Sequence, residues 1–158
     1  MSEINSFFDD KLNEECGVFG IFNMETASEL TYYGLHSLQH RGQEGCGIVT
    51  SDGVNLKSHK GEGLVTSIFS EQNIKDLKGT SAIGHVRYST AGGGGMMNVQ
   101  PFLFHHHTGD FALCHNGNIV NSNELRLYLE KQGTIFQSTS DKHPCFLRKQ
   151  TSSQQNFF

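Results

Sequence analysis

The patterned part of the chain opens with a short apolar run and continues with a helical repeat. Residues 16–22 are apolar apart from two glycines, which predicts a buried strand with close backbone neighbours. In residues 27–39 the apolar Leu30, Tyr33 and Leu38 fall on one helical face. A helix that buries this one stripe is therefore expected.

Glycines mark where this helix packs closely and where it ends. Gly34 lies within the helical stretch and allows a neighbouring element to approach, while Gly42 is a candidate stop signal. Two later stretches, residues 64–69 and 71–78, predict short helices closed by Gly79.

Turn dipeptides between alternating stretches predict two hairpins. Asp52-Gly53 favours the positive φ of a tight turn and lies between predicted strands at residues 47–51 and 54–59. Thr108-Gly109-Asp110 lies in the same way between residues 102–106 and 111–115. Both hairpins imply antiparallel pairing.

The remaining elements are two strands and one more helix. The strands are expected at residues 81–89 and 134–138. The helix lies between them and has Asn121 as its N-cap with Glu124 at the N3 position. Its expected inward residues are Leu125, Tyr128 and Leu129, and Gly133 follows its end.

The order of these elements predicts the fold class. Strands that arrive in hairpins, with helices clustered between them, indicate an α+β layered domain rather than a doubly wound parallel sheet. Four consecutive glycines at residues 92–95 predict a mobile loop. This loop lacks the spacing and the terminal Lys-Ser/Thr of a P-loop, so we interpret it as a flexible connection.

The net charge of the protein lies in its first fifteen residues. The 158-residue chain has a formal net charge of -4, and the leader 1–15 holds five acidic residues against one lysine. The balanced remainder has no basic stripe for nucleic acid or an anionic membrane, which favours a small substrate. The leader lacks the basic and apolar regions of a secretory signal, and no apolar run is long enough to span a bilayer. We interpret the leader as a propeptide.

Neither the cysteines nor the histidines indicate a metal site. The cysteines Cys16, Cys46, Cys114 and Cys145 are widely spaced and form no Cys-x-x-Cys pair. Residues 105–107 are three consecutive histidines, but neighbours in a strand point to opposite faces and do not converge on one ion. We expect no metal in this chain.

Candidate functional residues lie at the ends of predicted elements, where side chains from different segments converge. They are Cys16, Arg41-Gly42, Arg87, Asn116-Gly117 and Asp141. A plainer interpretation stays open for each one, because a lone cysteine is usually a small buried apolar residue and an Arg or Asp usually forms a weak surface ion pair. His85 and Tyr88 flank Arg87, and they either line the same pocket or pack within the sheet.

Six blocks in one order carry a family resemblance. The blocks are Cys16-Gly-Val-Phe-Gly, Leu38-Gln-His-Arg-Gly-Gln-Glu, Gly84-His-Val-Arg-Tyr-Ser-Thr, Asn98-Val-Gln-Pro-Phe, His115-Asn-Gly-Asn and Ser138-Thr-Ser-Asp. With these blocks the chain resembles the class II glutamine amidotransferases, which are N-terminal nucleophile hydrolases, and within them most closely the amidophosphoribosyltransferases. Gly45-Cys46 departs from the Ser-Ala that is usual there.

The resemblance implies a fold and a mechanism. The fold is a four-layer αββα sandwich, incomplete at its C-terminus. Cys16 is the implied nucleophile, and its own α-amino group, freed by removal of the leader, is the base, since such a group has a reference pKa of about 7.7 to 8.0.

The other candidate residues receive implied roles in binding glutamine. Asn116 and Gly117 form the oxyanion hole, Arg87 holds the α-carboxylate and Asp141 holds the α-ammonium group. Arg41 and Gly42 orient the freed terminus, although a helix end beside an exposed arginine explains them almost as well.

The resemblance also implies how the chain is organised. Residues 1–15 are a propeptide and residues 16–141 are part of a type 2 glutamine amidotransferase domain. Residues 142–158 fall outside the resemblance and are predicted to be disordered, since Pro144 opposes the helix expected after Asp141. Our hypothesis for this tail is a coding sequence truncated or shifted in frame just after Asp141.

Partners and cofactors are expected from the same family. Glutamine is the implied substrate of this chain, in the cytoplasm. Phosphoribosyl diphosphate, with Mg²⁺, belongs to a phosphoribosyltransferase domain that the resemblance does not cover, and some full-length relatives, which are homo-oligomeric, carry an iron–sulfur cluster. Two alternatives remain: an inactive remnant, or another class II amidotransferase such as glucosamine-6-phosphate synthase.

Overall fold

The computed structural model describes residues 16–88, 95–117, 120–136 and 147–148. The predicted propeptide, most of the four-glycine loop, Asp141 and most of the tail lie outside the described residues.

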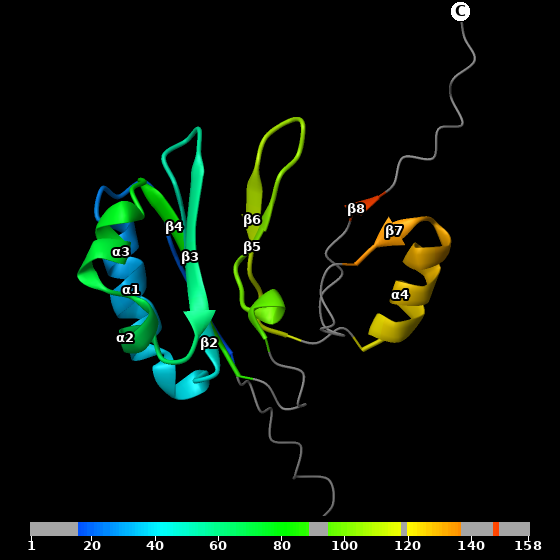
Figure 1. The fold of residues 1–158 in the computed structure, drawn as a ribbon, viewed down its shortest axis with the longest axis horizontal. Coiled ribbons are helices and arrows are strands. Elements are labelled where there is room, and N and C mark those ends of the chain that lie inside the picture. Colours follow the sequence, from blue (N-terminus) through cyan, green and yellow to red (C-terminus); the bar gives the residue numbers. More distant parts are fainter. Residues whose placement is uncertain (1–15, 89–94, 118–119, 137–146, 149–158) are drawn as a thin grey trace, which may run out of the picture.

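Four antiparallel strands form the largest described sheet, in the order β1–β4–β2–β3 (Figure 1). The first predicted hairpin is confirmed, because β2 and β3 pair across a turn in which Gly53 has a φ of 94°. Strand β1 lies at one edge of this sheet and Val18 is exposed, so the expectation of a buried strand is wrong for that face of β1. The strands are β1 (Gly17–Ile21), β2 (Gly45–Ser51), β3 (Leu56–Glu62) and β4 (Ser81–Arg87).

Three helices cover one face of this sheet (Figure 1). They are α1 (Ala27–Ser37), α2 (Val65–Ile68) and α3 (Glu71–Asp76), each where the sequence predicts a helix. The core between helices and sheet contains Leu35, Ile48, Val65 and Val86, all fully buried. Burial of each such side chain stabilises the fold by about 1.5–3 kcal/mol.

The inward face of α1 differs from the prediction. Leu30 and Tyr33 are exposed, and the buried residues of the helix are Ala27, Ser28, Thr31 and Leu35. The reason is close packing on β4, since a Cβ at Gly84 would lie 2.7 Å from Thr31 and 2.8 Å from Leu35. Gly34 confirms the predicted close approach, because a Cβ there would lie 2.6 Å from the ring of Phe19.

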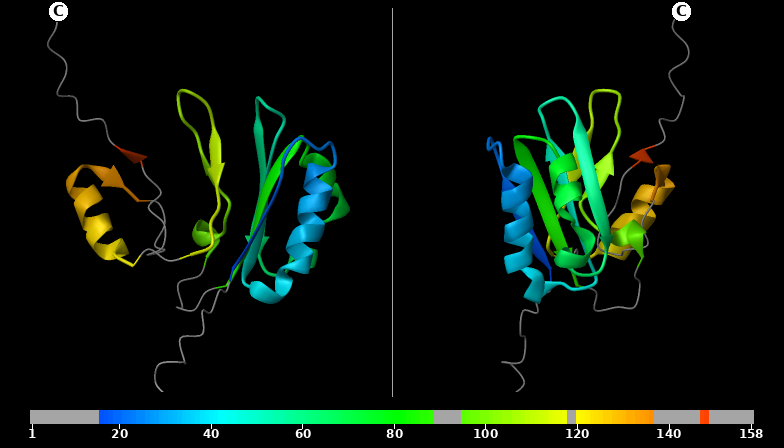
Figure 2. Two further views of the ribbon diagram at one scale, coloured as in Figure 1. Left: turned by 180° about the vertical axis from the view of Figure 1, so that it is seen from behind. Right: turned by 60° about the vertical axis from the view of Figure 1, so that its left-hand side comes forward.

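A second, two-stranded layer covers part of the opposite face of the sheet. Strands β5 (Phe102–Phe104) and β6 (Phe111–Leu113) pair antiparallel and confirm the second hairpin, with Gly109 at a φ of 130° in the turn. Both views of Figure 2 place this hairpin on the side of the sheet away from α1. The segment before β5 packs closely on β2, where Gly47 has no room for a Cβ against the Gln100 carbonyl.

The last described elements lie beyond the hairpin, so the order in space is helices, sheet, hairpin, helix (Figures 1 and 2). They are α4 (Ser122–Lys131), β7 (Thr134–Ile135) and β8 (Leu147–Arg148). The α+β layered arrangement is therefore confirmed. Two residues of the tail form β8, which pairs antiparallel with β7, although the sequence pattern gives no strand there.

Helix α4 forms where it is predicted but does not bury the expected stripe. None of its described residues is buried and Tyr128 is exposed, while Leu125 and Leu129 are half-buried. Asn121 occupies the N-cap position without a side-chain cap hydrogen bond. Gly133, at a φ of 84°, follows the helix as expected.

Candidate active site

Cys16 lies immediately before β1, next to the end of β4. The two strands are antiparallel and Gly17 pairs with Val86, so the start of β1 meets the last residues of β4. The half-buried Cys16 Sγ donates a weak hydrogen bond of 3.6 Å to the carbonyl of Tyr88. This places the thiol beside the Arg87-Tyr88 segment.

Two side chains from distant segments hold the carbonyl of Cys16. Arg41 Nε donates to this oxygen at 2.9 Å and Asn116 Nδ2 donates to it at 3.0 Å. Three segments, which contribute Cys16, Arg41 and Asn116, therefore meet at one atom.

The segment that carries Arg41 is fixed by Gln39, a residue that the sequence reasoning did not single out. Residues Gln39–Arg41 form a short 3₁₀ helix directly after α1. Gln39 Nε2 donates to the Gly42 carbonyl, and its Oε1 accepts a 2.6 Å hydrogen bond from the backbone N–H of Val65. This amide side chain thus joins the 3₁₀ helix to the start of α2.

Gly42 allows this segment to lie against β4. Its backbone is extended, with a φ of -164°, so the left-handed helix stop that glycine usually supplies is not the reason for glycine here. A Cβ at Gly42 would lie 2.7 Å from the carbonyl carbon and 2.8 Å from the nitrogen of Arg87. The glycine is required by this contact between backbones.

Arg87 is held beside the same contact. Its side chain is only 12% exposed, and its Nη1 lies 3.6 Å from Oε2 of Glu44. The backbone N–H of Glu44 also donates to the Arg87 carbonyl at 3.1 Å. Glu44 was not singled out from the sequence. The available signal was its place at the end of the Leu38–Glu44 block, which precedes β4 along the chain.

Asn116 and Gly117 follow β6 at the exposed end of this site. Gln100, which is buried, accepts a 2.8 Å hydrogen bond on its Oε1 from the backbone N–H of His115. Gly117 has a φ of 150°, a conformation that glycine adopts readily. Gln100 was also missed, because its partner lies fifteen residues further along the chain.

The other described cysteines are poor nucleophiles. Burial raises the pKa of the Cys46 thiol to about 12 and that of the Cys114 thiol to about 11. Both thiols are therefore protonated near neutral pH, and the thiol is far less reactive than the thiolate. Cys145 and Asp141 lie outside the described residues.

His85 is fully buried in β4, two residues before Arg87. Burial lowers the pKa of this imidazole to about 4, and the nearby backbone of His115 offsets only part of that effect. The ring is therefore neutral at pH 7. Of the two interpretations of His85, exposure to an open pocket is excluded by its burial.

The three consecutive histidines lie at the turn of the β5–β6 hairpin. His105 Nδ1 is 2.8 Å from Asp110 Oδ2, and His106 Nδ1 is 2.7 Å from the hydroxyl of Thr108. Within the described part of the chain, no group of three or more Cys, His, Asp or Glu side chains is placed to hold a metal ion.

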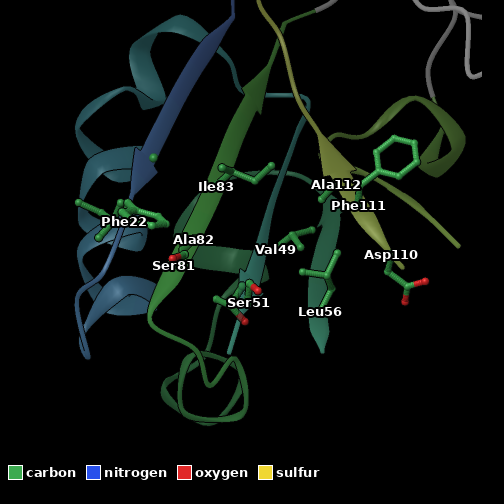
Figure 3. Close-up of a pocket in the computed structure, with 13 residues that line it drawn as sticks. Phe22, Val49, Ser51, Leu56, Ser81, Ala82, Ile83, Asp110, Phe111 and Ala112 are labelled. Carbon is green, nitrogen blue, oxygen red and sulfur yellow. The ribbon is translucent and has the colours of Figure 1, made fainter. Parts of the chain in front are cut away.

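A groove of about 390 Å³ lies between the four-stranded sheet and the β5–β6 hairpin (Figure 3). It is lined by the far end of β1 and by residues of β2, β4 and β6, among them Val49, Ile83 and Phe111. Its position at the opposite end of β1 separates it from the convergence at Cys16.

No helix in the described ranges combines the length and apolar character needed to cross a membrane.

Comparison with known proteins shows which class of protein this chain resembles. Residues 85–157 match the family of glutamine amidotransferase domains. That match continues past Asp141, where the sequence resemblance ended. Just under half of the chain is therefore similar to glutamine amidotransferase domains.

Within that class, the similar proteins are amidophosphoribosyltransferases. The Bacillus subtilis (strain 168) protein of that name is 61% identical over 131 residues, which cover 82% of this chain and 28% of the relative. The Staphylococcus aureus (strain Mu50) protein is 57% identical over 131 residues, with 82% and 26% covered. The chain therefore spans little more than a quarter of the length of these relatives.

Solved structures show the same similarity. A structure of the allosteric regulatory enzyme of purine biosynthesis superposes with a TM-score of 0.75 at 59% identity, over 79% of this chain and 27% of the other. Glutamine phosphoribosylpyrophosphate amidotransferase from B. subtilis, complexed with ADP and GMP, gives a TM-score of 0.73 at 56% identity over the same shares. The fold is therefore that of the N-terminal part of these enzymes.

Proposed function

We propose that the chain supplies the glutaminase half of an amidophosphoribosyltransferase, hydrolysing glutamine to glutamate and ammonia. The observation that carries the proposal is the convergence of Arg41 and Asn116 on the carbonyl of Cys16. A lone structural cysteine has no need of two donors drawn from segments 25 and 100 residues away.

The proposed chemistry begins with removal of residues 1–15, which frees the α-amino group of Cys16. That amine takes the thiol proton, and the sulfur attacks the side-chain amide carbon of glutamine. The tetrahedral intermediate collapses to a glutamyl thioester, and the amide nitrogen leaves as ammonia with the proton that the amine held. Water then cleaves the thioester, which releases glutamate and restores the thiol.

Asn116 serves two purposes in this scheme. One N–H of its amide holds the Cys16 carbonyl, and a side-chain amide has two donor hydrogens, so the other is directed to the substrate oxygen. The backbone N–H of Gly117 is the second donor of the oxyanion hole. Loss of one such donor typically raises the barrier by roughly 3–4 kcal/mol.

Arg87 and Asp141 bind the two charged groups of the glutamine backbone. The Arg87 guanidinium already lies 3.6 Å from one carboxylate, that of Glu44, which supports a role in carboxylate binding. This separation is too long for a good hydrogen bond, so the substrate carboxylate, bound by two parallel hydrogen bonds, is the stronger partner. Arg41 and Gly42 orient the nucleophile.

The ammonia is delivered to phosphoribosyl diphosphate, giving 5-phosphoribosylamine for purine synthesis. That step belongs to a region beyond the quarter of the relatives that this chain spans, together with its Mg²⁺ and any iron–sulfur cluster. The glutaminase step itself needs no cofactor. In this proposal residues 1–15 are a propeptide, residues 16–141 belong to the glutaminase domain, and the protein acts in the cytoplasm as a homo-oligomer.

The test is glutamine hydrolysis by the purified chain, followed as glutamate and ammonia. The proposal expects equal amounts of both products, abolished by Cys16→Ala. Cys46→Ala is the matched control, because Cys46 lies in the core on the other face of the sheet; it should lower stability and keep turnover. Glutamine hydrolysis that survives Cys16→Ala would overturn the proposal. So would a wild-type chain that shows the melting transition of a folded protein but hydrolyses no glutamine.

A further inference from the structure

Two buried polar side chains in the described residues have no hydrogen-bond partner: the hydroxyl of Thr31 and both ring nitrogens of His85. Both residues are fully buried. A buried polar group without a partner costs free energy that an apolar side chain of similar shape would avoid. His85 is the more expensive of the two, because two nitrogens are involved.

His85 faces the second layer rather than the helices. Its neighbours Gly84 and Val86 face α1, since a Cβ at Gly84 would contact Thr31 and Leu35 while Val86 belongs to the core beneath α1. Alternate residues of a strand point to opposite faces, so His85 lies on the same face as Arg87.

The segment that follows β6 lies over this ring. Cys114 Sγ is 3.8 Å from the carbonyl of Gly84, which places the start of the segment on the strand beside His85. After burial, the largest influence on the pKa of the imidazole is a hydrogen-bond approach to the backbone of His115, which raises it, whereas the charges of His115 and Arg87 lower it. This approach falls outside the geometry of a formed hydrogen bond. The buried ring therefore lies directly below the residues that lead into Asn116 and Gly117.

We propose that His85 is a positioning residue for the oxyanion turn: its ring donates an N–H weakly to the carbonyl of His115 in the free chain and more strongly when substrate occupies the site. Gln100 already holds the N–H of His115 at 2.8 Å, so the two side chains would hold this residue from both sides. The His115 carbonyl belongs to the same planar peptide as the N–H of Asn116. Fixing that plane fixes the direction in which Asn116 projects.

The positioning role requires that the imidazole ring of His85 is neutral. A protonated imidazole beside Arg87 would be a buried like-charge pair, whereas the neutral ring has one donor and one acceptor nitrogen. Hydrogen bonds of this kind are often poorly aligned in an empty site and tighten when substrate binds. This accounts for a buried donor that is not yet satisfied.

The inference rests on the proposed function, and its test separates the two. His85→Leu removes the donor, His85→Gln keeps an N–H, and Thr31→Val is the matched control, since it removes the other buried unpartnered polar group from the opposite face of the sheet. Each full chain is compared with wild type in thermal melting, in hydrogen exchange of residues 114–117, and in the rate at which a glutamine-analogue electrophile modifies Cys16.

His85→Leu should keep or raise the melting temperature, because it removes an unsatisfied polar group. It should nevertheless speed exchange of the 114–117 amides and slow modification of Cys16 by about tenfold, the effect of one lost hydrogen bond. His85→Gln should recover most of that loss, and Thr31→Val should leave exchange and modification unchanged. Modification of Cys16 by iodoacetamide, which needs no oxyanion hole, should be the same in all four proteins.

Unchanged exchange at residues 114–117 in His85→Leu would overturn the positioning role whether or not the chain is active. Equal slowing of Cys16 modification in Thr31→Val would also overturn the positioning role, since the effect would then follow from repacking of the sheet. If the electrophile does not modify Cys16 in wild type while His85→Leu still speeds amide exchange at residues 114–117, the proposed function is wrong. The positioning of this segment by His85 is then still supported.

Discussion

At the scale of single residues, the best-anchored atom of the candidate nucleophile is its carbonyl oxygen and not its sulfur. Arg41 and Asn116 donate to that oxygen at 2.9 and 3.0 Å, whereas the sulfur makes a long contact of 3.6 Å with the Tyr88 carbonyl. A backbone fixed in this way orients the side chain without occupying the group that reacts. Such an arrangement suits a thiol that must attack a bound substrate.

The described thiols should differ sharply in reactivity. At about pH 7.5, iodoacetamide should modify the half-buried Cys16 and spare Cys46 and Cys114, because burial raises the pKa of both core thiols well above the working pH. Peptide mapping by mass spectrometry measures the modification site by site. Unfolding in denaturant is the control, since it should make all cysteines react; labelling of Cys46 in the native chain at the rate of Cys16 would contradict the burial of the core.

Motif resemblance singled out the residues that we propose carry chemistry, but not all of those that contact them. Cys16, Arg41, Arg87 and Asn116 could be singled out from the sequence because their types and order match a known pattern. Glu44, Gln39 and Gln100 could not, because each makes its contact with a residue distant in the chain. Residue type alone gives no information about such contacts.

At the scale of elements, the site depends on how closely one backbone approaches another. The 3₁₀ helix Gln39–Arg41 reaches Cys16 because Gly42 lies against the backbone of Arg87 in β4. Helix α1 lies close to β1 because Gly34 meets the ring of Phe19. Glycine in these places creates proximity rather than an unusual turn.

Gly42→Ala should therefore displace the segment that carries Arg41. The new Cβ would meet backbone atoms of Arg87 at 2.7–2.8 Å, and a backbone cannot move aside as a flexible side chain can. We expect a loss of about 1–3 kcal/mol in the free energy of unfolding, typical of overpacking, together with slower modification of Cys16 by a glutamine analogue. Denaturant titration and mass spectrometry measure the two effects.

Gly20→Ala is the matched control for this substitution. A Cβ at Gly20 in β1 would have its nearest neighbours at 3.7 and 3.8 Å, which is ordinary contact. Its unfolding free energy and its rate of modification should stay close to those of wild type. If both variants behave alike, the close approach at Gly42 does not determine the geometry of the site.

Element positions were predictable and element faces were not. The hairpins at Asp52-Gly53 and around Gly109 follow from turn chemistry, which is local. The buried face of α1 depends on the glycine opposite it, Gly84, which lets small side chains such as Thr31 pack closely and leaves Tyr33 outside. Helical periodicity favours the larger residues and therefore misses this case.

At the scale of the molecule, the described residues form layers, and only part of the surface of the four-stranded sheet is covered by the layers beside it. The four-stranded sheet is packed by α1–α3 on one face and partly by β5–β6 on the other, and Val18 and Phe22 remain exposed at its β1 edge. The similar enzymes are about three times as long as this chain. The α+β layered class could be predicted from the hairpins and the order of the layers only from the family resemblance, whereas the degree of coverage could not be predicted.

The buried imidazole makes stability depend on pH. The pKa of His85 is about 4 in the folded chain and 6.5 when unperturbed, so the unfolded state binds this proton first as the pH falls. The stabilisation is fully present above about pH 7.5 and is lost as the pH falls from about 6.5 towards 4. At about pH 5 the loss should be on the order of 2 kcal/mol.

Denaturant titrations of wild type and His85→Leu at about pH 7.5 and pH 5 isolate this contribution, because other titrating groups are common to both proteins. The variant should lose less stability on acidification, by roughly the same 2 kcal/mol. Parallel losses in the two proteins would show that His85 is not buried as a neutral ring.

The most direct measurement of the central claim is mass spectrometry of the chain after reaction with a glutamine-analogue electrophile. Our account predicts one adduct, on a Cys16 that is the first residue of the processed polypeptide and carries a free amino group, and no adduct in Cys16→Ala. An adduct on a chain that still retains residues 1–15, or on any other cysteine, would contradict the assignment of Cys16 as an N-terminal nucleophile.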